Sequence, residues 1–366
     1  MSFATVPELL EEIRAGRMVV IVDDEGRENE GDLIMAAELV KPSDINFMVT
    51  HARGLVCLSV TRERAARIGL APMVRDNTSQ YHTNFTVSIE AAEGVTTGIS
   101  AYDRAHTIRT AVRPDASPRD LSQPGHIFPL MSQPGGVLSR SGHTEAASDL
   151  ALLAGLEPAG VLVEVLNADG TMARRPELEV FAREHGLKIG SIEALIRHRL
   201  ETEHTIEHVD SRAIDTGHGP FQLHTYRDRL GHGLHFALQR GQADAASPAL
   251  VRVQMQNVLA DALHWRRDDF GPLAGDVLAA IAEAGQGVLL LLSEPQGADA
   301  LLARLRGDAA PSPMRVDCEW RRNGAGSQIL ADLGYGKLKV LGTPRKQVGL
   351  AGFGLEVVEY VALSPR

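Results

Sequence analysis

Short apolar runs separated by polar turns follow one another along the first 200 residues, and they predict a sheet with covering helices. Residues 18–22 are five apolar side chains in a row, which is typical of a buried strand. Residues 55–61, 85–89 and 160–166 predict further strands, the second of them by its alternation of apolar and polar positions. Residues 125–136 are rich in glycine and proline, so we expect a long loop there.

Amphipathic segments between these strands predict helices. The segment 43–53 begins at Ser43, a residue type common at N-caps, and stops before Gly54. Other helices are predicted over residues 7–14, 62–68, about 100–112, 145–154, 177–185 and 192–200. Strands and helices intermix without strict alternation, so the expected fold class is a mixed α/β (α+β) domain.

The second half of the chain has its own pattern from about residue 205. Strands are predicted at 250–254, 287–292 and 338–341, and helices at 273–283 and from about 324 onward. A charged stretch at 201–204 separates this pattern from the first. The sequence therefore predicts two domains, residues 1–204 and residues 205–366, each large enough for a core of its own.

Composition narrows the classes of function. The 366 residues carry a formal net charge of −10, which argues against nucleic-acid or anionic-membrane binding because both need a basic surface. Cys57 and Cys318 are the only cysteines, so neither a disulfide framework nor a four-cysteine zinc site is expected. The N-terminal segment carries charges where a signal peptide needs an apolar core, and apolar runs such as 288–292 are too short to span a bilayer. We therefore expect a cytoplasmic protein without membrane contact.

The strand at 18–22 runs directly into residues 23–32, where six carboxylates stand within ten positions. Two glycines in this stretch let the backbone turn sharply. So much negative charge repels itself unless a cation lies in the turn, and a divalent ion bound by oxygen ligands would suit it. On this stretch alone, a solvated surface loop is an equal alternative.

Four further features are candidates for chemistry. The run Arg-Ser-Gly-His-Thr at 140–144 precedes a predicted helix, where N–H groups and an arginine suit a phosphate, although a plain capping sequence explains it equally well. His126 stands in a Gly- and Pro-framed loop as an acid–base group or, more commonly, a surface histidine. Glu164, inside an apolar strand, points either outward, which is favoured, or into the core as a proton-transfer group. For Cys57, a buried unreactive thiol is favoured.

The acidic stretch 23–32 resembles the signature of 3,4-dihydroxy-2-butanone-4-phosphate synthase, an enzyme family of riboflavin biosynthesis. The resemblance covers about residues 3–200 and extends in order through the segments 96–101, 125–130, 140–145 and 169–174. It implies conversion of D-ribulose 5-phosphate into dihydroxybutanone phosphate and formate. It also implies a divalent cation, usually Mg²⁺, and a homodimer. Because a histidine ligand is softer than Mg²⁺ prefers, Mn²⁺ is the alternative cation.

The same resemblance implies roles for individual residues. Glu28 and His143 would ligate the metal, while His126 and Glu164 would be essential for catalysis. The substrate would be held by Arg27, Glu28, Asp32, Arg140, Ser141, Gly142, His143, Thr144 and Glu164, with the segment from Arg140 to Thr144 suited to its phosphate. The remaining acids of the turn, which stay candidates for proton transfer or for support of the ligands, are Asp23, Asp24, Glu25 and Glu30.

The second half resembles GTP cyclohydrolase II, but the cysteines that bind zinc in that family are replaced. Their positions hold Asn257, Asp268 and Phe270, which cannot form the thiolate site that zinc needs. The loop at 294–301 lacks the arginine of that family, and Cys318 lies too far along the chain to substitute. We therefore expect neither zinc nor GTP hydrolysis. The alternatives are a bifunctional enzyme and a second domain with a structural or regulatory role.

Overall fold

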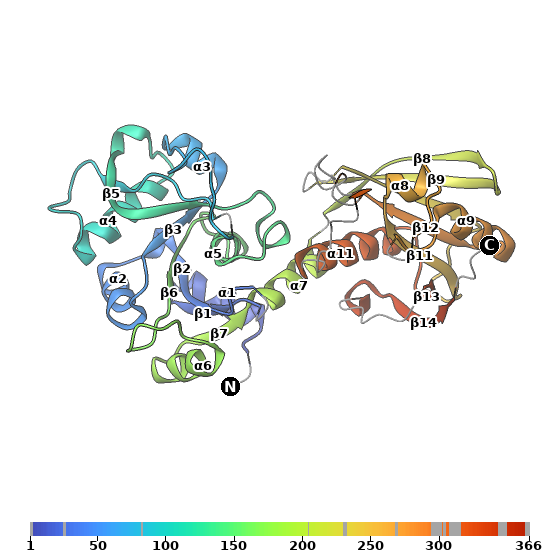
Figure 1. The fold of residues 1–366 in the computed structure, drawn as a ribbon. Coiled ribbons are helices and arrows are strands. Elements are labelled where there is room, and N and C mark those ends of the chain that lie inside the picture. The colour runs from blue at the N-terminus through green and yellow to red at the C-terminus, as the bar shows by residue number, and fades with distance from the viewer. Residues whose placement is uncertain are drawn as a thin grey trace. The chain divides into compact units, whose positions relative to one another are not determined.

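The computed structural model describes residues 3–24, 27–81, 83–203, 205–229, 233–267, 270–293, 302, 305–306, 316–342 and 350–362. The chain divides into two compact units, Met1–His198 and Arg199–Arg366. Because the helix Ile192–Thr202 (α7) crosses this division, the domain limit at residue 204 stays a prediction. Within the described residues each unit contains a seven-stranded mixed sheet with helices (Figure 1), so the predicted fold class is confirmed.

The first unit contains the elements up to α7. Its strands are β1 Val19–Val22, β2 Gly31–Ala36, β3 Cys57–Val60, β4 Ile89–Ala91, β5 Leu121–Met131, β6 Gly160–Glu164 and β7 Lys188–Ser191. Its α-helices are α1 Val6–Arg14, α2 Pro42–Phe47, α3 Arg62–Arg67, α4 Ala101–Val112, α5 His143–Leu153 and α6 Arg175–Glu184. Short helical turns are η1 Ala37–Leu39, η2 Met48–Ala52, η3 Pro118–Asp120 and η4 Gly136–Leu138. The strands lie in the order β4-β5-β3-β6-β2-β1-β7.

One face of this sheet packs against α2, α4 and α6. Val20 of β1, Leu33 of β2 and Leu58 of β3 are fully buried in one cluster with Ile45 of α2 and Leu178 of α6. Side chains alternate between the two faces of a strand, so Ile21, Ile34 and Cys57 point the other way.

The opposite face packs against α1 and α5. A Cβ on Gly190 of β7 would lie 2.4 Å from a methyl carbon of Leu9 in α1, so glycine lets the helix pack closely on the strand. The hydroxyl of Ser59 in β3 donates to the carbonyl oxygen of Thr144 in α5 at 2.6 Å. The N-terminus of α5 is thereby held over the edge of the sheet where β1 and β6 end and β2 and β3 begin.

The second unit has its own sheet in the order β14-β13-β11-β12-β10-β9-β8. The strands are β8 Ile206–Thr216, β9 Gly219–Asp228, β10 Leu234–Arg240, β11 Ala249–Met255, β12 Gly287–Leu292, β13 Lys337–Leu341 and β14 Glu356–Val361. The helices are α8 Val258–Asp261, α9 Ala274–Ala284, α11 Val316–Asp332 and the short turn η6 Leu350–Phe353. The predicted strands at 250–254, 287–292 and 338–341 are therefore confirmed.

Several sequence predictions in the first unit were wrong in detail. The predicted loop 125–136 is strand up to Met131, because β5 pairs with β3 on one side and β4 on the other despite its glycine and proline. The segment 43–53 is helical as predicted, with α2 followed by the π-helix η2, but the left-handed residue at its end is Arg53, with φ 71°, and not Gly54. Gly54 is needed for close approach instead, since a Cβ there would lie 2.3 Å from the carbonyl oxygen of Glu164.

Candidate active site

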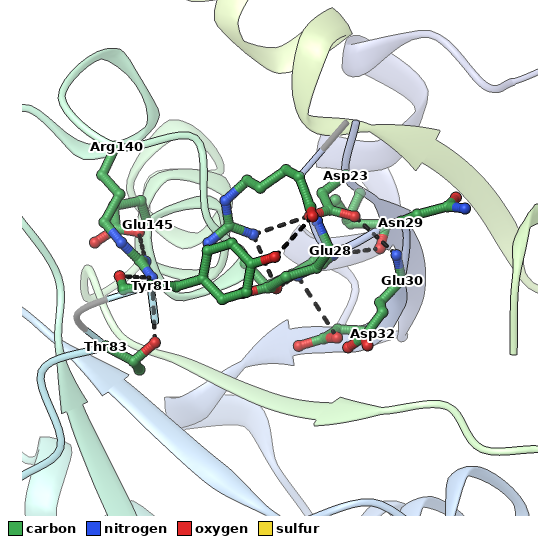
Figure 2. A network of polar contacts seen from close by, with 12 residues as sticks. Asp23, Glu28, Asn29, Glu30, Asp32, Tyr81, Thr83, Arg140 and Glu145 are labelled. Atoms are coloured by element: carbon green, nitrogen blue, oxygen red, sulfur yellow. Dashed lines mark hydrogen bonds and ion pairs between the residues drawn. The ribbon is translucent and has the colours of Figure 1, made fainter. Parts of the chain in front are cut away.

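The acidic turn between β1 and β2 is organised by Asp23. Its fully buried carboxylate accepts hydrogen bonds from Arg27 Nη1 at 2.9 Å, from the backbone N–H of Glu28 at 3.1 Å and from that of Glu30 at 2.8 Å. Figure 2 shows these contacts converging on the Asp23 side chain. Asp23 therefore fixes the course of the turn and the direction in which Glu28 points.

Arg27 and Tyr81 hold the outer side of the turn. Arg27 Nη1 lies 2.8 Å from Glu28 Oε2, and its guanidinium stands 5.2 Å from the centre of the Tyr81 ring. The Tyr81 hydroxyl donates to the carbonyl oxygen of Arg27 at 2.8 Å. This arrangement keeps the Glu28 carboxylate beside a cation while leaving it accessible, since the side chain is 21% exposed.

His143, the first residue of α5, faces these acids from the other side. Its Nε2–H donates to the carbonyl oxygen of Ile21 at 3.1 Å, because a carbonyl can only accept. That bond turns Nδ1 towards the turn, where it lies 3.8 Å from Glu28 Oε2 and 3.7 Å from Asp32 Oδ1. A buried imidazole nitrogen is thus aimed between two carboxylates.

Asp32 and Glu164 are opposite one another in the β2–β6 ladder, so their side chains share one face of the sheet. Asp32 is 3% exposed, and its Oδ1 is a buried oxygen without a hydrogen-bond partner among the described residues. Glu164 is half-buried and accepts a long hydrogen bond of 3.4 Å from the backbone N–H of Leu55. Glu164 therefore faces a pocket, a placement between the solvent-facing and core alternatives considered from the sequence.

Burial and neighbouring charges shift the pKa values of Asp32, His143 and Glu28. Burial raises the pKa of Asp32 to about 7, against the opposing charge of His143 and with help from Glu164 and Glu28. Burial acts against the charged form of His143, yet the nearby carboxylates of Asp32 and Glu28 raise the pKa of His143 to about 9. Burial also works against the Glu28 carboxylate, but His143 and Arg27 lower the pKa of Glu28 to about 2.

Arg140 is held in place by Glu145, Tyr81 and Thr83. Its Nη1 lies 2.6 Å from Glu145 Oε2, and its Nη2 donates to the carbonyl oxygen of Tyr81 and to Thr83 Oγ1, both at 3.2 Å (Figure 2). Gly142 leaves room for this side chain, because a Cβ there would lie 2.3 Å from Arg140 Nη1 and would force the guanidinium to move. Burial raises the pKa of Glu145 despite the arginine beside it.

Several of these side chains line one pocket of about 510 Å³, counting the part that is open to solvent. Its lining residues are Arg27, Glu28, Asp32, Leu55, Cys57, Thr83, Phe85, Leu130, Arg140, His143, Thr144, Leu162, Val163 and Glu164. Of the metal, substrate and catalytic residues implied by the resemblance, Ser141, Gly142 and His126 are not part of this lining. Thr83 and the organising role of Asp23 were missed, and no local signal distinguishes either from its polar neighbours.

Comparison with known protein families identifies the family of each half of the chain. Residues 7–198 match the family model of 3,4-dihydroxy-2-butanone 4-phosphate synthase. The chain belongs to that synthase family. Residues 207–362 match the model described as GTP cyclohydrolase II. Both resemblances expected from the sequence are thereby confirmed.

Relatives extend the match over the whole chain. A 3,4-dihydroxy-2-butanone 4-phosphate synthase of Pseudomonas aeruginosa is 54% identical over 363 residues and 99% of each chain. The riboflavin biosynthesis protein RibBA of Aquifex aeolicus is 47% identical over 99% of this chain and 93% of its own. A crystal structure of RibBX, a two-domain synthase from A. baumannii, aligns with a TM-score of 0.84 at 45% identity, over 99% of this chain and 100% of that one. A synthase structure in complex with two magnesium ions aligns at 42% identity and a TM-score of 0.54, over 55% of this chain and 98% of that one.

The pocket residues of this synthase family member fit a divalent cation. Asp23, Glu28 and His143 offer ligand atoms that all lie within 4.8 Å of one another. Asp23 is already committed to the turn, whereas Glu28 Oε2, His143 Nδ1 and the unpartnered Asp32 Oδ1 face the same space. Carboxylate oxygens with a single imidazole nitrogen suit Mg²⁺ or Mn²⁺.

Cys57 lies in the same pocket but is shielded. It is 5% exposed, and burial together with the charge of Glu164 raises the pKa of the thiol well above its usual range. The thiol therefore stays protonated near neutral pH, as expected for an unreactive cysteine.

The zinc positions of the cyclohydrolase family are used differently in the second unit. Asn257 is buried, and its side-chain oxygen caps α8 by accepting from Leu259 N at 3.2 Å and Ala260 N at 3.4 Å. Phe270 packs edge-on to Trp265. Asp268 and the loop 294–301 lie outside the described residues. Within the described part of this unit, no three His, Cys, Asp or Glu side chains come together as a metal site.

Cation binding should release protons from this site. In the cation-free protein near neutral pH, His143 carries a proton that coordination through Nδ1 must displace, since its pKa is about 9. We expect about one proton released per Mg²⁺ at this histidine near neutral pH, falling as the pH rises above about 9. Calorimetric titration in buffers of different ionisation enthalpy measures the number. Proton release that does not change between neutral pH and pH values above about 9 would contradict the assignment.

Proposed function

We propose that the first unit converts D-ribulose 5-phosphate into 3,4-dihydroxy-2-butanone 4-phosphate and formate for riboflavin biosynthesis. The observation that carries the proposal is the single pocket in which Glu28, Asp32, His143 and Glu164 face Arg140, within a chain of this synthase family. The pocket combines groups that hold a cation, groups that move protons and a cationic wall for a phosphate, which are the requirements of this reaction.

Substrate binding would use the two ends of the pocket. The phosphate would lie against Arg140 and the N-terminus of α5 at Thr144, where backbone N–H groups without intrahelical acceptors favour an anion. Ser141 and Gly142 would serve this end through the backbone, and Arg27 with Glu28 and Asp32 would contact the hydroxyl groups at the other end.

Glu28 and His143 would hold the cation. A bound Mg²⁺ or Mn²⁺ ion would polarise the adjacent oxygens of the sugar and favour its enolisation. The reaction then requires proton removal, loss of water, a shift of the carbon skeleton and expulsion of C4 as formate. Asp32, whose pKa is about 7, can both accept and return a proton near neutral pH. Glu164 on the same face would exchange protons with the other end of the sugar. His126, which is outside the pocket lining, would be the third proton-transfer group, as the family resemblance implies.

The second unit is proposed to lack cyclohydrolase activity and to bind no zinc. Replacement of the family's cysteines by Asn257, Asp268 and Phe270 supports this, since amide, carboxylate and phenyl groups do not form a thiolate site. The match of residues 207–362 to the cyclohydrolase model keeps a bifunctional enzyme as the second candidate.

One experiment separates these candidates. Purified full-length protein with Mg²⁺ should release formate from D-ribulose 5-phosphate and none from GTP in parallel assays, and metal analysis should find no zinc. If no formate were released from D-ribulose 5-phosphate, the proposed function would be wrong. Formate from GTP, or stoichiometric zinc, would establish the bifunctional alternative.

Assembly and location are also proposals. We propose a homodimer, as the family resemblance implies, which light scattering can test. The cytoplasmic location expected from the sequence stays a prediction. Among the described residues, no helix has the length and apolar character needed to cross a membrane.

A further inference from the structure

His126 is paired with an acid that the sequence did not single out. Its Nδ1 lies 2.7 Å from Oε2 of Glu90 in β4, and the same oxygen accepts the backbone N–H of His126 at 3.2 Å. Glu90 is 13% exposed at its side chain, whereas the imidazole of His126 is 43% exposed. The largely buried Glu90 carboxylate thus holds the Nδ1 side of the imidazole, while the ring as a whole stays partly exposed.

The carboxylate of Glu90 is itself held in place. Its second oxygen, Oε1, accepts from the hydroxyl of Thr107 in α4 at 2.8 Å, and that hydroxyl accepts the backbone N–H of Ala91 at 3.0 Å. Arg104, one turn earlier on α4, adds a positive charge near Glu90. Two donors, the Thr107 hydroxyl and the backbone N–H of His126, already point at this carboxylate, and a cation lies near it. The side chain therefore accepts rather than donates, so the shared proton lies on His126 Nδ1.

Gly98 packs closely against the Glu90–His126 pair. Its backbone has φ +87°, and a Cβ there would lie 1.9 Å from Glu90 Oε2 and 2.5 Å from His126 Nδ1. The loop that carries Gly98 is fastened by Asp103, whose Oδ2 accepts from Gly98 N at 3.1 Å and from Thr96 Oγ1 at 2.7 Å. The segment 96–100 therefore packs over the Nδ1 side of the ring, where Glu90 is the hydrogen-bond partner among the described residues.

We propose that Glu90 is a positioning residue that holds His126 in the Nδ1–H tautomer and so presents the lone pair of Nε2 for proton transfer. This deepens the proposed function and rests on it for the role of His126. When Nε2 accepts a proton, the imidazolium that forms is stabilised by the Glu90 carboxylate, which lies 2.7 Å from Nδ1. When Nε2 returns the proton, the ring goes back to the same tautomer and no other group changes its charge.

Steady-state formate release tests the proposal with a double-mutant cycle. Glu90→Ala should lower kcat on the order of 10²-fold, because the ring loses its orientation and its counter-charge. Glu90→Gln should cost on the order of 10-fold, because the amide oxygen still accepts from Nδ1–H without the charge. In a His126→Ala background neither change should cost more than about twofold, since Glu90 acts through the ring. Glu93→Gln, an exposed acid three residues along the chain, is the matched control and should leave kcat unchanged.

Nitrogen-15 NMR of labelled histidines gives a readout that needs no substrate. The spectrum contains 14 histidines, and the His126→Ala variant identifies the signal of interest. In the parent protein Nδ1 of His126 should be protonated and Nε2 should not, and in Glu90→Ala the ring should move towards the Nε2–H tautomer.

Two results overturn the proposal. One is a loss in Glu90→Ala that persists in full in the His126→Ala background, which assigns Glu90 to the fold. The other is an unchanged tautomer in Glu90→Ala. A parent protein that releases no formate contradicts the proposed function instead, and the NMR measurement still decides whether Glu90 positions His126.

Discussion

Formate release from D-ribulose 5-phosphate should fall at least about 10³-fold when either Glu28 or His143 is replaced by alanine, because the cation contributes several kcal/mol of charge stabilisation. Glu28 Oε2 and His143 Nδ1 stand 3.8 Å apart on either side of the space proposed for the ion. Removing one of them leaves the other with Asp32, too few ligands for a weakly held divalent ion. Formate production at saturating Mg²⁺ measures the effect, and calorimetric Mg²⁺ titration should show weakened binding in both variants.

Glu63→Ala is the matched control for this experiment. Glu63 is an exposed acid on α3, away from the pocket, and its loss should leave activity and Mg²⁺ affinity unchanged. If Glu28→Ala and His143→Ala kept activity within about tenfold of the parent protein while remaining folded, these two residues could not be the metal ligands.

Asp32→Asn should lower kcat by about 10²- to 10⁴-fold, because asparagine cannot transfer a proton. It should not lower thermal stability, because burying the Asp32 carboxylate among other acids destabilises the folded state. The side chain is buried, its Oδ1 has no hydrogen-bond partner among the described residues, and burial with neighbouring acids raises its pKa to about 7. Asparagine keeps the shape but cannot exchange a proton. It also removes one charge from a group of three acids, Asp32, Glu28 and Glu164, and so relieves repulsion.

The measurements are kcat from formate release and Tm from thermal unfolding. Asp115→Asn, whose side chain is 82% exposed, serves as the control and should change neither. An Asp32→Asn variant with normal kcat would remove Asp32 from proton transfer. A variant with a much lower Tm would mean that the carboxylate stabilises the fold.

The sequence by itself determined the fold class, the family and the chemical types of group in the first half. Residues 18–22 and 160–166 bury apolar runs whose length and β-branched content specify strands almost independently of context. Residues 23–32 and 140–145 identify the family because their order of charges and glycines is long and specific. Glu28 and His143, named from these motifs, do face each other across the pocket.

Tertiary structure decided which side chains meet. The register of β2 against β6 sets Glu164 opposite Asp32, so that Glu164 faces the pocket where the sequence allowed either solvent or core. Asp23 was one unassigned acid among several, and only the closed turn shows that its carboxylate is used by the backbone. Glu90 and His126 are 36 positions apart, and pairing between β4 and β5 brings them together. Hydrophobic period and local motif specify elements, but the register between strands distant in the chain depends on packing of the whole sheet, which no local pattern encodes.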